Sequence, residues 1–405
     1  MLQMPVKERK TVVYSIQKPF KSSVSANSSL PMFYYITVTR ECDLKCTYCY
    51  GKACQDFGSD FRDLRIDYDI PTLIRYDVKN LKVFIDKDLH PTVIFYGGEP
   101  LLRIEKIEEI MDRIQPKNFM IQTNGLHLED LEPRYLNRLH TILVSIDGDE
   151  TQTDQNRGRG TYKRIMQNLE KIRKNGFKGE IIARMTVSVG RDVEKQVKHL
   201  LHNDGNPFTS VHWQLDAQFW EKDYDECLFE KWTTQDYNPQ IRKLIDFWVE
   251  HMENHGEVLK IYPFLGVMES LLKAMPSKLR CGAGWIEFNI QTDGIITPCP
   301  VMSGMKDFYL GNIYDSDPTE LMDAVSVTDP CPQCEIVDLC GGRCLYANVT
   351  KLWGEKGFQL VCNTVRNLVH SLKRSLPEIQ SFIRKGIVSI EDFYYTKYNS
   401  CEIIP

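Results

Sequence analysis

The chain has 405 residues, of which 42% are hydrophobic and 26% are charged, and its formal net charge is -5. This balance is ordinary for a globular protein of two or three domains, and with no long basic run it disfavours a nucleic-acid substrate. The sequence shows no apolar signal core and no apolar run of membrane-spanning length, so we expect a cytoplasmic protein without a membrane partner. In a reducing compartment, its 13 cysteines point to metal ligation rather than disulfides.

The first half of the chain alternates between two patterns. Residues 1–31 are polar and are predicted to form an N-terminal arm. Within 32–220, apolar strand candidates lie at 33–39, 92–96, 118–122, 140–146, 180–187 and 209–215, and helical patterns lie at 72–84, 104–114, 128–138, 161–175 and 191–203. This alternation requires crossover connections and a parallel sheet, which predicts an α/β fold with a (β/α)6 partial barrel.

Three cysteines follow the first expected strand. Cys42, Cys46 and Cys49 have the spacing C-x3-C-x2-C. Thiolates are soft ligands that suit an iron–sulfur cluster or zinc, and ordinary sites of both kinds use four protein ligands. Three local thiolates with no evident fourth therefore favour a cluster with one open iron. Zinc, and thiols that only pack, are the alternatives.

The stretch resembles the cluster loop of the radical S-adenosylmethionine (AdoMet, or SAM) superfamily. Tyr48, just before the third cysteine, also matches that pattern. The resemblance implies a [4Fe–4S] cluster whose fourth iron is chelated by AdoMet. It further implies that one electron cleaves AdoMet to methionine and a 5′-deoxyadenosyl radical, which abstracts a hydrogen atom. The superfamily has the same partial-barrel fold, with its active site at the carboxyl ends of the strands.

Turn motifs end the next three expected strands. Gly97, Gly98 and Glu99 belong to a GGEP turn that matches the superfamily motif for the AdoMet amino group. Asn-Gly and Asp-Gly dipeptides, which are common in turns, follow the third and fourth strands. There the resemblance implies AdoMet contacts at three residues: Asn124, Ser145 and Asp147. A plain turn is the alternative interpretation of each motif.

Charged and polar residues also mark the fifth and sixth strands. Arg157 lies in NRGRGTY and Arg184 lies inside the apolar fifth strand. A buried arginine needs an anion, which is either the AdoMet carboxylate or a structural salt-bridge partner. In the sixth strand His212, Gln214 and Asp216 share one face. Polar groups inside a barrel are costly unless they bind something, so Gln214 and Asp216 are candidate ribose or substrate contacts, with Asp216 the catalytic candidate and a strand-end cap the alternative.

Residues 221–280 are predicted to form a helical linker, and seven cysteines follow within 281–362. Their spacing, C-x12-G-x4-C, then C-x2-C-x5-C-x3-C, then x17-C, resembles the SPASM domain at every position. The resemblance implies two auxiliary [4Fe–4S] clusters, a distal one on Cys331, Cys334, Cys340 and Cys362 and a proximal one on Cys281, Cys299 and Cys344. Glu287 stands where some members supply a fourth proximal ligand. Zinc sites are the alternative, and Cys54, Cys227 and Cys401 are spare thiols.

A C-terminal helix and tail are expected over 363–405. Enzymes of this group mostly modify ribosomally made peptides or proteins, so the resemblance implies cross-linking, epimerisation or oxidation at a Cα or side-chain carbon. A ferredoxin or flavodoxin is the expected electron donor. The alternative is formylglycine formation by a sulfatase maturase, although such maturases carry an Asp where this chain has Pro300. A non-catalytic iron–sulfur or zinc scaffold is the third hypothesis.

Overall fold

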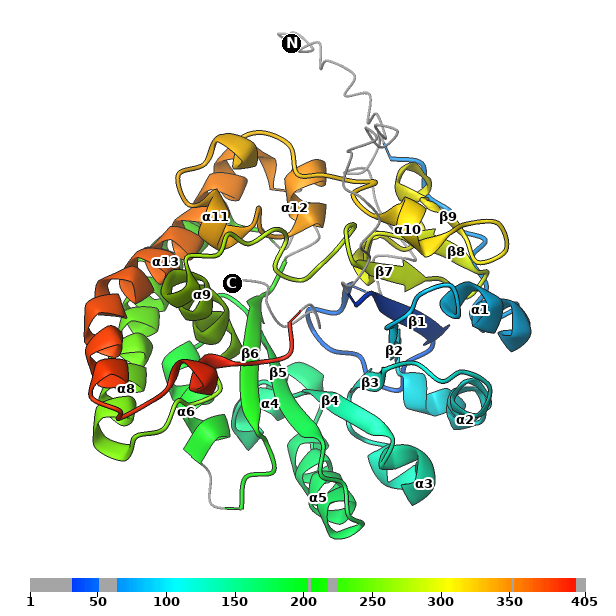
Figure 1. The fold of residues 1–405 in the computed structure, drawn as a ribbon, viewed down its shortest axis with the longest axis horizontal. Coiled ribbons are helices and arrows are strands. Elements are labelled where there is room, and N and C mark those ends of the chain that lie inside the picture. Colours follow the sequence, from blue (N-terminus) through cyan, green and yellow to red (C-terminus); the bar gives the residue numbers. More distant parts are fainter. Residues whose placement is uncertain (1–30, 51–63, 203–204, 218–223, 352, 398–405) are drawn as a thin grey trace, which may run out of the picture.

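A curved sheet of parallel strands organises the computed structural model, which describes residues 31–50, 64–202, 205–217, 224–351 and 353–397 (Figure 1). The sheet order β6-β5-β4-β3-β2-β1 follows the chain without a break. The strands are β1 (Phe33–Thr39), β2 (Thr92–Gly97), β3 (Asn118–Thr123), β4 (Leu139–Ser145), β5 (Glu180–Val187) and β6 (Ser210–Leu215). The predicted (β/α)6 partial barrel is thus confirmed. Cys54, Cys401 and nearly all of the predicted N-terminal arm lie outside the described residues.

The crossover helices lie on the outside of the curved sheet (Figure 1). They are α1 (Val78–Ile85), α2 (Ile104–Arg113), α3 (Pro133–Leu136), α4 (Glu150–Arg157), α5 (Thr161–Lys174) and α6 (Val193–His202). The helix expected at 72–84 begins only at Val78, because the Asp77 side chain accepts a hydrogen bond from the Lys79 amide and caps it. The helix expected at 128–138 is interrupted before Pro133, which starts α3.

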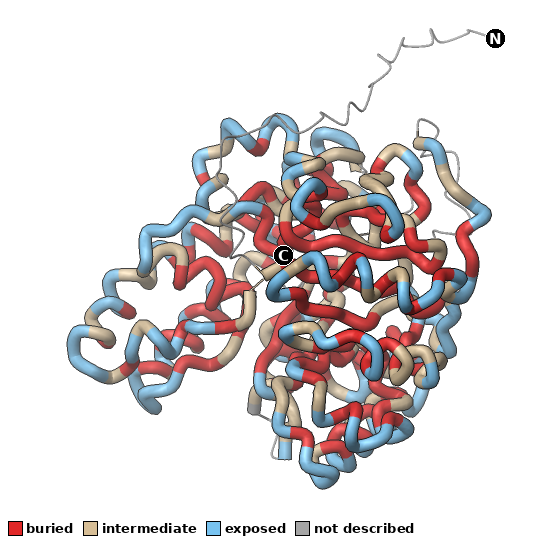
Figure 2. The backbone as a smooth tube through the Cα atoms, turned by 45° about the vertical axis from the view of Figure 1, so that its right-hand side comes forward, coloured by how far each residue is buried: buried red, intermediate tan, exposed pale blue. Residues whose placement is uncertain are grey.

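Apolar runs became strands because both faces of this sheet are covered. All seven residues of β1 are buried, and β2 to β6 are buried almost throughout (Figure 2). Parallel strands covered on both faces have nearly continuous apolar sequences, which explains why these strands were predicted almost to the residue. Their side chains belong to the same hydrophobic core as the flanking helices.

The sheet continues beyond β1 into the cysteine-rich region. β7 (Glu287–Ile290) pairs with β1 in parallel, with Phe33 opposite Glu287, and β8 (Ile295–Thr297) and β9 (Gly311–Asn312) follow antiparallel. The boundary predicted after residue 280 therefore does not separate the cysteine-rich region from the barrel sheet, because β7 extends that sheet. Short helices α10 (Pro318–Leu321), α11 (Val337–Cys340) and α12 (Leu345–Thr350) then lead into α13 (Gly354–Arg384).

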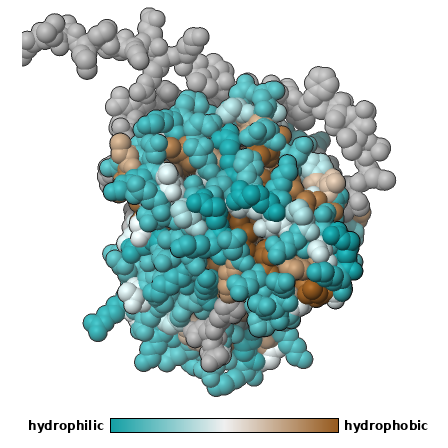
Figure 3. Space-filling model, turned by 90° about the vertical axis from the view of Figure 1, so that its left-hand side faces the viewer, coloured by the Kyte–Doolittle hydropathy of each residue, from teal (hydrophilic) through white to brown (hydrophobic). Residues whose placement is uncertain are grey.

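A helical layer covers the β6 side of the molecule (Figure 1). It contains α7 (Glu226–Trp232), α8 (Asn238–His255) and α9 (Tyr262–Lys273), and α13 packs against both α8 and α9. The outer face on this side is mainly hydrophilic (Figure 3). Within the described ranges, no helix is long and apolar enough to cross a membrane.

Candidate active site and auxiliary cysteine sites

The GGEP turn and the chain leading to the first cysteines are in close contact. The Gly98 amide donates to the Thr39 carbonyl oxygen over 2.8 Å, and the Glu99 amide donates to that of Glu41 over 2.7 Å. A Cβ atom on Gly97 would lie 2.1 Å from the Thr39 oxygen, and one on Gly98 would lie 2.1 Å from the Glu41 oxygen. Both glycines are therefore required by backbone packing beside the cysteine loop.

The Glu99 side chain joins the ends of β2 and β3. Its carboxylate accepts hydrogen bonds from the Leu101 amide (3.0 Å), the Thr123 hydroxyl (2.8 Å) and the Asn124 amide (2.7 Å). Complete burial raises the pKa of Glu99 to about 7, against the lowering effect of these donors. Glu99 does not line the cavity described below, so its direct contact with AdoMet stays a prediction.

Arg157 and Tyr48 are held by Asp147. Arg157 makes two hydrogen bonds of 3.0 Å to the two Asp147 oxygens, and the Tyr48 hydroxyl also donates to this carboxylate. Burial, the largest single effect, lowers the pKa of Arg157, but Asp147, Tyr48 and Cys46 together raise it above its ordinary value, so the guanidinium stays charged. Arg157 and Tyr48 line the cavity and Asp147 lies behind them. Arg157 is thus satisfied by a structural salt bridge, and contact of Asp147 with AdoMet stays a prediction.

Strands β5 and β6 present three of the predicted side chains to the cavity. Arg184 donates to the Gln214 side-chain oxygen over 3.0 Å, and Asp216 accepts a hydrogen bond of 3.0 Å from the Ser188 hydroxyl. Arg184, Gln214 and Asp216 all line the cavity. His212, which alternation placed on the same face, is fully buried and does not line it.

A single cavity of about 1040 Å³ collects most of the predicted site residues. At one end lie Cys42, Cys46 and Cys49 with the turns that follow β2 to β4. At the other end lie Cys281, Cys299, Cys344 and Glu287. The predicted AdoMet residues in its wall are Tyr48, Gly97, Gly98, Asn124, Ser145, Arg157, Arg184 and Gln214. The structure therefore brings together two cysteine sets that are more than 230 residues apart in sequence.

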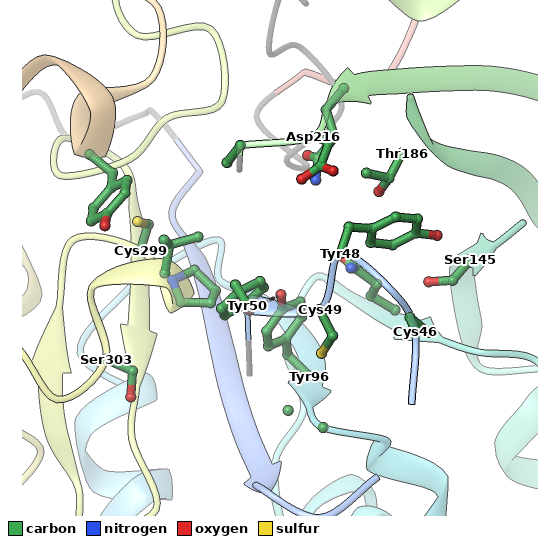
Figure 4. A pocket seen from close by; sticks show the side chains of 18 of the residues that line it. Cys46, Tyr48, Cys49, Tyr50, Tyr96, Ser145, Thr186, Asp216, Cys299 and Ser303 are labelled. Atoms are coloured by element: carbon green, nitrogen blue, oxygen red, sulfur yellow. Dashed lines mark hydrogen bonds between the residues drawn. The ribbon is translucent and has the colours of Figure 1, made fainter. Parts of the chain in front are cut away.

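Two tyrosines that the sequence did not single out lie between these sets. The Tyr50 and Tyr96 hydroxyls are hydrogen-bonded to each other, and both residues line the cavity between Cys49 and Cys299 (Figure 4). Burial raises the pKa of Tyr96, and both Cys49 and Cys299 are close enough to act on it electrostatically. Tyr50 follows Cys49 directly and Tyr96 precedes Gly97. Their places next to the cysteine loop and the GGEP turn are the only sequence signals that could have indicated a role.

A second, smaller cavity is lined by Cys331, Cys334, Cys340 and Cys362. Cys344 lines both cavities. Donors surround the sulfur atoms: the Asn348 side-chain amide lies 3.4 Å from the Cys331 sulfur, and the Arg343 backbone amide lies 3.4 Å from that of Cys340. N–H donors to sulfur are the usual surroundings of iron–sulfur clusters.

The thiols of the described residues are not grouped as a single zinc ion would require. In the described part of the chain, no three Cys, His, Asp or Glu side chains are grouped tightly enough to hold one ion. Zinc at about 2.3 Å from each sulfur would require sulfurs about 3.8 Å apart, whereas a cluster binds each thiolate to a different iron and spaces them wider. Glu287 lines the cavity beside the proximal cysteines, and its carboxylate is, after burial, the next cause that raises the pKa of Cys281.

Comparison with known proteins agrees with this geometry. Residues 36–202 match the Radical SAM superfamily. The cysteine-type anaerobic sulfatase-maturating enzyme of Clostridium perfringens is 28% identical over 336 residues, which cover 75% of this chain and 85% of that protein. The sporulation killing factor maturation protein SkfB of Bacillus subtilis is 22% identical over 319 residues, or 76% of this chain and 68% of that protein.

Solved structures show the same fold. Native anSMEcpe with bound AdoMet and Cp18Cys peptide superposes with a TM-score of 0.65 at 21% identity, covering 87% of this chain and 100% of that chain. Streptococcus suis SuiB bound to its precursor peptide SuiA gives a TM-score of 0.50 at 16% identity, covering 80% and 73%. With the cysteine loop, the GGEP turn and the barrel in place, residues 36–202 form a radical SAM domain, and the chain is an enzyme similar to maturases of the SPASM type. AdoMet and a [4Fe–4S] cluster are the cofactors that this domain implies.

Proposed function

We propose that this enzyme modifies a peptide or protein by removing a hydrogen atom from a Cα or side-chain carbon, which leads to a cross-link, an epimer or an oxidised residue. The continuous cavity between Cys42, Cys46, Cys49 and the proximal set supports this proposal most strongly. Pockets for one drug-sized ligand span roughly 300–1,000 Å³. The 1040 Å³ cavity lies at the upper end of that range, which supports binding of AdoMet beside a second molecule.

The proposal includes three [4Fe–4S] clusters, held by Cys42, Cys46 and Cys49, by the proximal set, and by the distal set of four cysteines. When bound, AdoMet and its cluster supply the carbon-centred radical. The chain's own residues hold the cofactor and shield it from water. Arg157 is neutralised by Asp147, so Arg184 is the better-placed cation for the AdoMet carboxylate. A ferredoxin or flavodoxin is the proposed electron donor.

Two carboxylates, those of Asp216 and Glu287, line the cavity. Asp216 accepts a hydrogen bond from Ser188 at the end of β6, and we assign it to holding or accepting a proton of the substrate. Glu287 is 1% exposed and acts electrostatically on both Cys281 and Cys299. This position makes Glu287 the proposed fourth ligand of the proximal cluster.

The test of function uses synthetic peptides encoded by short open reading frames beside the gene. Reconstituted enzyme, AdoMet and a strong reductant are incubated with each peptide, and peptide mass, residue chirality and deoxyadenosine are measured. We expect one peptide to be modified and to increase deoxyadenosine formation. Cys299→Ala should still cleave AdoMet but give no modified peptide. If small molecules increase deoxyadenosine formation and no peptide does, the proposal is contradicted.

Formylglycine formation is the second candidate. It is favoured by the 28% identity to the Clostridium perfringens sulfatase-maturating enzyme. Pro300, which begins a 3-10 turn and lines the cavity, argues against it because proline cannot act as a base. A cysteine peptide taken from a sulfatase distinguishes the two candidates: conversion of its cysteine to an aldehyde would support formylglycine formation and replace the first proposal.

A further inference from the structure

Arg343 lies between the two auxiliary cysteine sites. It is placed in the chain between Cys340, which lines the smaller cavity, and Cys344, which lines both. Arg343 itself lines both cavities. Its Nε atom is buried and has no hydrogen-bond partner among the described residues. A guanidinium is always charged, so this position puts a fixed positive charge in the wall between the two sites.

The charge of Arg343 acts on the thiols around it. The Arg343 backbone amide donates to the Cys340 sulfur over 3.4 Å, and Arg343 lines the smaller cavity together with Cys340 and Cys362. A cation and an N–H donor both favour negative charge on sulfur, and such effects are strong where little water is present.

We propose that Arg343 is a positioning residue for electron transfer, which raises the reduction potentials of both auxiliary clusters. The reduced form of an iron–sulfur cluster carries one more negative charge than the oxidised form. A buried cation between two clusters therefore stabilises the reduced form of each, as hydrogen bonds and local charge do at other cluster sites. The inference depends on the three-cluster assignment made above.

Arg366 provides a matched control. It lines only the smaller cavity, where its Nη2 atom lies 4.0 Å from the Cys334 sulfur. It carries the same formal charge beside the distal cysteines, where its Nε atom lies 4.0 Å from a Glu335 carboxylate oxygen. Replacing Arg366 should therefore change the reduction potential of the distal cluster alone, whereas replacing Arg343 should change the potentials of both auxiliary clusters.

The experiment compares full-length wild type, Arg343→Gln, Arg343→Lys and Arg366→Gln after anaerobic reconstitution. Iron content and thermal unfolding report assembly, and midpoint potentials are measured by redox titration followed by electron paramagnetic resonance. For Arg343→Gln we expect both auxiliary potentials to fall by about 59 mV, a tenfold change for one electron. The potential of the cluster on Cys42, Cys46 and Cys49 should not move. Arg343→Lys should restore part of the shift, and Arg366→Gln should lower only the distal potential.

Two results would overturn the inference, and they are distinguishable. Full iron content with unmoved auxiliary potentials in Arg343→Gln, or a shift of the distal cluster alone, contradicts the role of Arg343 and leaves the proposed function intact. Wild-type protein with iron for only one cluster would remove the three-cluster assignment and this inference with it. If Arg343→Gln fails to assemble, Arg343→Met is compared with Arg343→Lys: both keep the apolar stem, and only the loss of charge should lower the two potentials.

Discussion

Arg157 and Asp147 form a two-point ion pair that is almost fully buried, with both N–O distances 3.0 Å and side-chain exposures of 6% and 1%. The same carboxylate accepts hydrogen bonds from the Tyr48 hydroxyl and, over 3.0 Å, from the Thr186 amide. Asp147 thereby ties the cysteine loop to α4 and β5. The position of Tyr48, next to Cys49 in the cysteine loop, is therefore held by this carboxylate.

Removing the charge of Asp147 should therefore destabilise the whole barrel. Asp147→Asn leaves Arg157 buried without a counterion, which costs about 3–5 kcal/mol of unfolding free energy. Urea unfolding of the two proteins measures the difference. The control is Glu170→Gln, which breaks an exposed pair with Lys174 and should leave the unfolding free energy nearly unchanged. Equal, small losses in both variants would contradict the role assigned to Asp147.

Glu99 should make stability depend on pH in an unusual direction. Its pKa rises from the model-peptide value of 4.5 to about 7 in the fold because of burial, so the folded state binds the proton more tightly than the unfolded state. The stabilisation is complete below about pH 4.5 and is lost as the pH rises through 7, a change of about 3 kcal/mol. Unfolding free energies of wild type and Glu99→Gln are compared from pH 4.5 to 8. The two should diverge with pH, and parallel curves would contradict this account.

Gly98 should tolerate no side chain. In Gly98→Ala the new Cβ would meet the Glu41 carbonyl oxygen at 2.1 Å and the Arg40 oxygen at 2.8 Å, so the backbone before Cys42 must shift. We expect overpacking to cost about 1–3 kcal/mol and AdoMet binding to weaken at least tenfold, measured by calorimetry on reconstituted protein. Gly176→Ala is the control, since nothing lies within 4 Å of its Cβ position. That variant should bind AdoMet normally, although its positive φ costs some stability.

Replacement of one cluster cysteine should separate radical formation from the auxiliary sites. Cys49→Ala is expected to lose about four of about twelve irons and to form deoxyadenosine only at the level of a reaction without enzyme. Cys227→Ala, at an exposed thiol in α7 that lines neither cavity, should keep all its iron and full AdoMet cleavage. Undiminished cleavage in Cys49→Ala would show that the cluster loop has been misassigned.

Glu287 offers a spectroscopic test of the proximal site. If its carboxylate is the fourth ligand, Glu287→Gln should change the electron paramagnetic resonance signal of the proximal cluster and leave the other two signals as they were. Asp293→Asn is the control, because Asp293 follows the same strand and does not line the cavity. An unchanged proximal signal in Glu287→Gln would leave that iron open or bound by another group.

The sequence predicted the strands well because each is an apolar run between turns. The structure puts each of the ten predicted cluster cysteines in the wall of a cavity. It missed α4, whose residues ETQTDQNR carry no apolar periodicity because its inner side chains, such as Arg157, are buried and polar. A turn dipeptide marked Asp147, but spacing alone does not reveal whether its carboxylate faces a ligand or an arginine. The Tyr50–Tyr96 pair and the pairing of β7 with β1 join distant segments, which local patterns do not encode.

The most direct test of the account is an iron count combined with an AdoMet cleavage assay on anaerobically reconstituted protein. The account predicts about twelve irons per chain, from three four-iron clusters, together with deoxyadenosine formed under a strong reductant. About four irons with cleavage would leave the radical site intact but remove both auxiliary clusters. Zinc in place of iron, with no cleavage, would contradict the central claim.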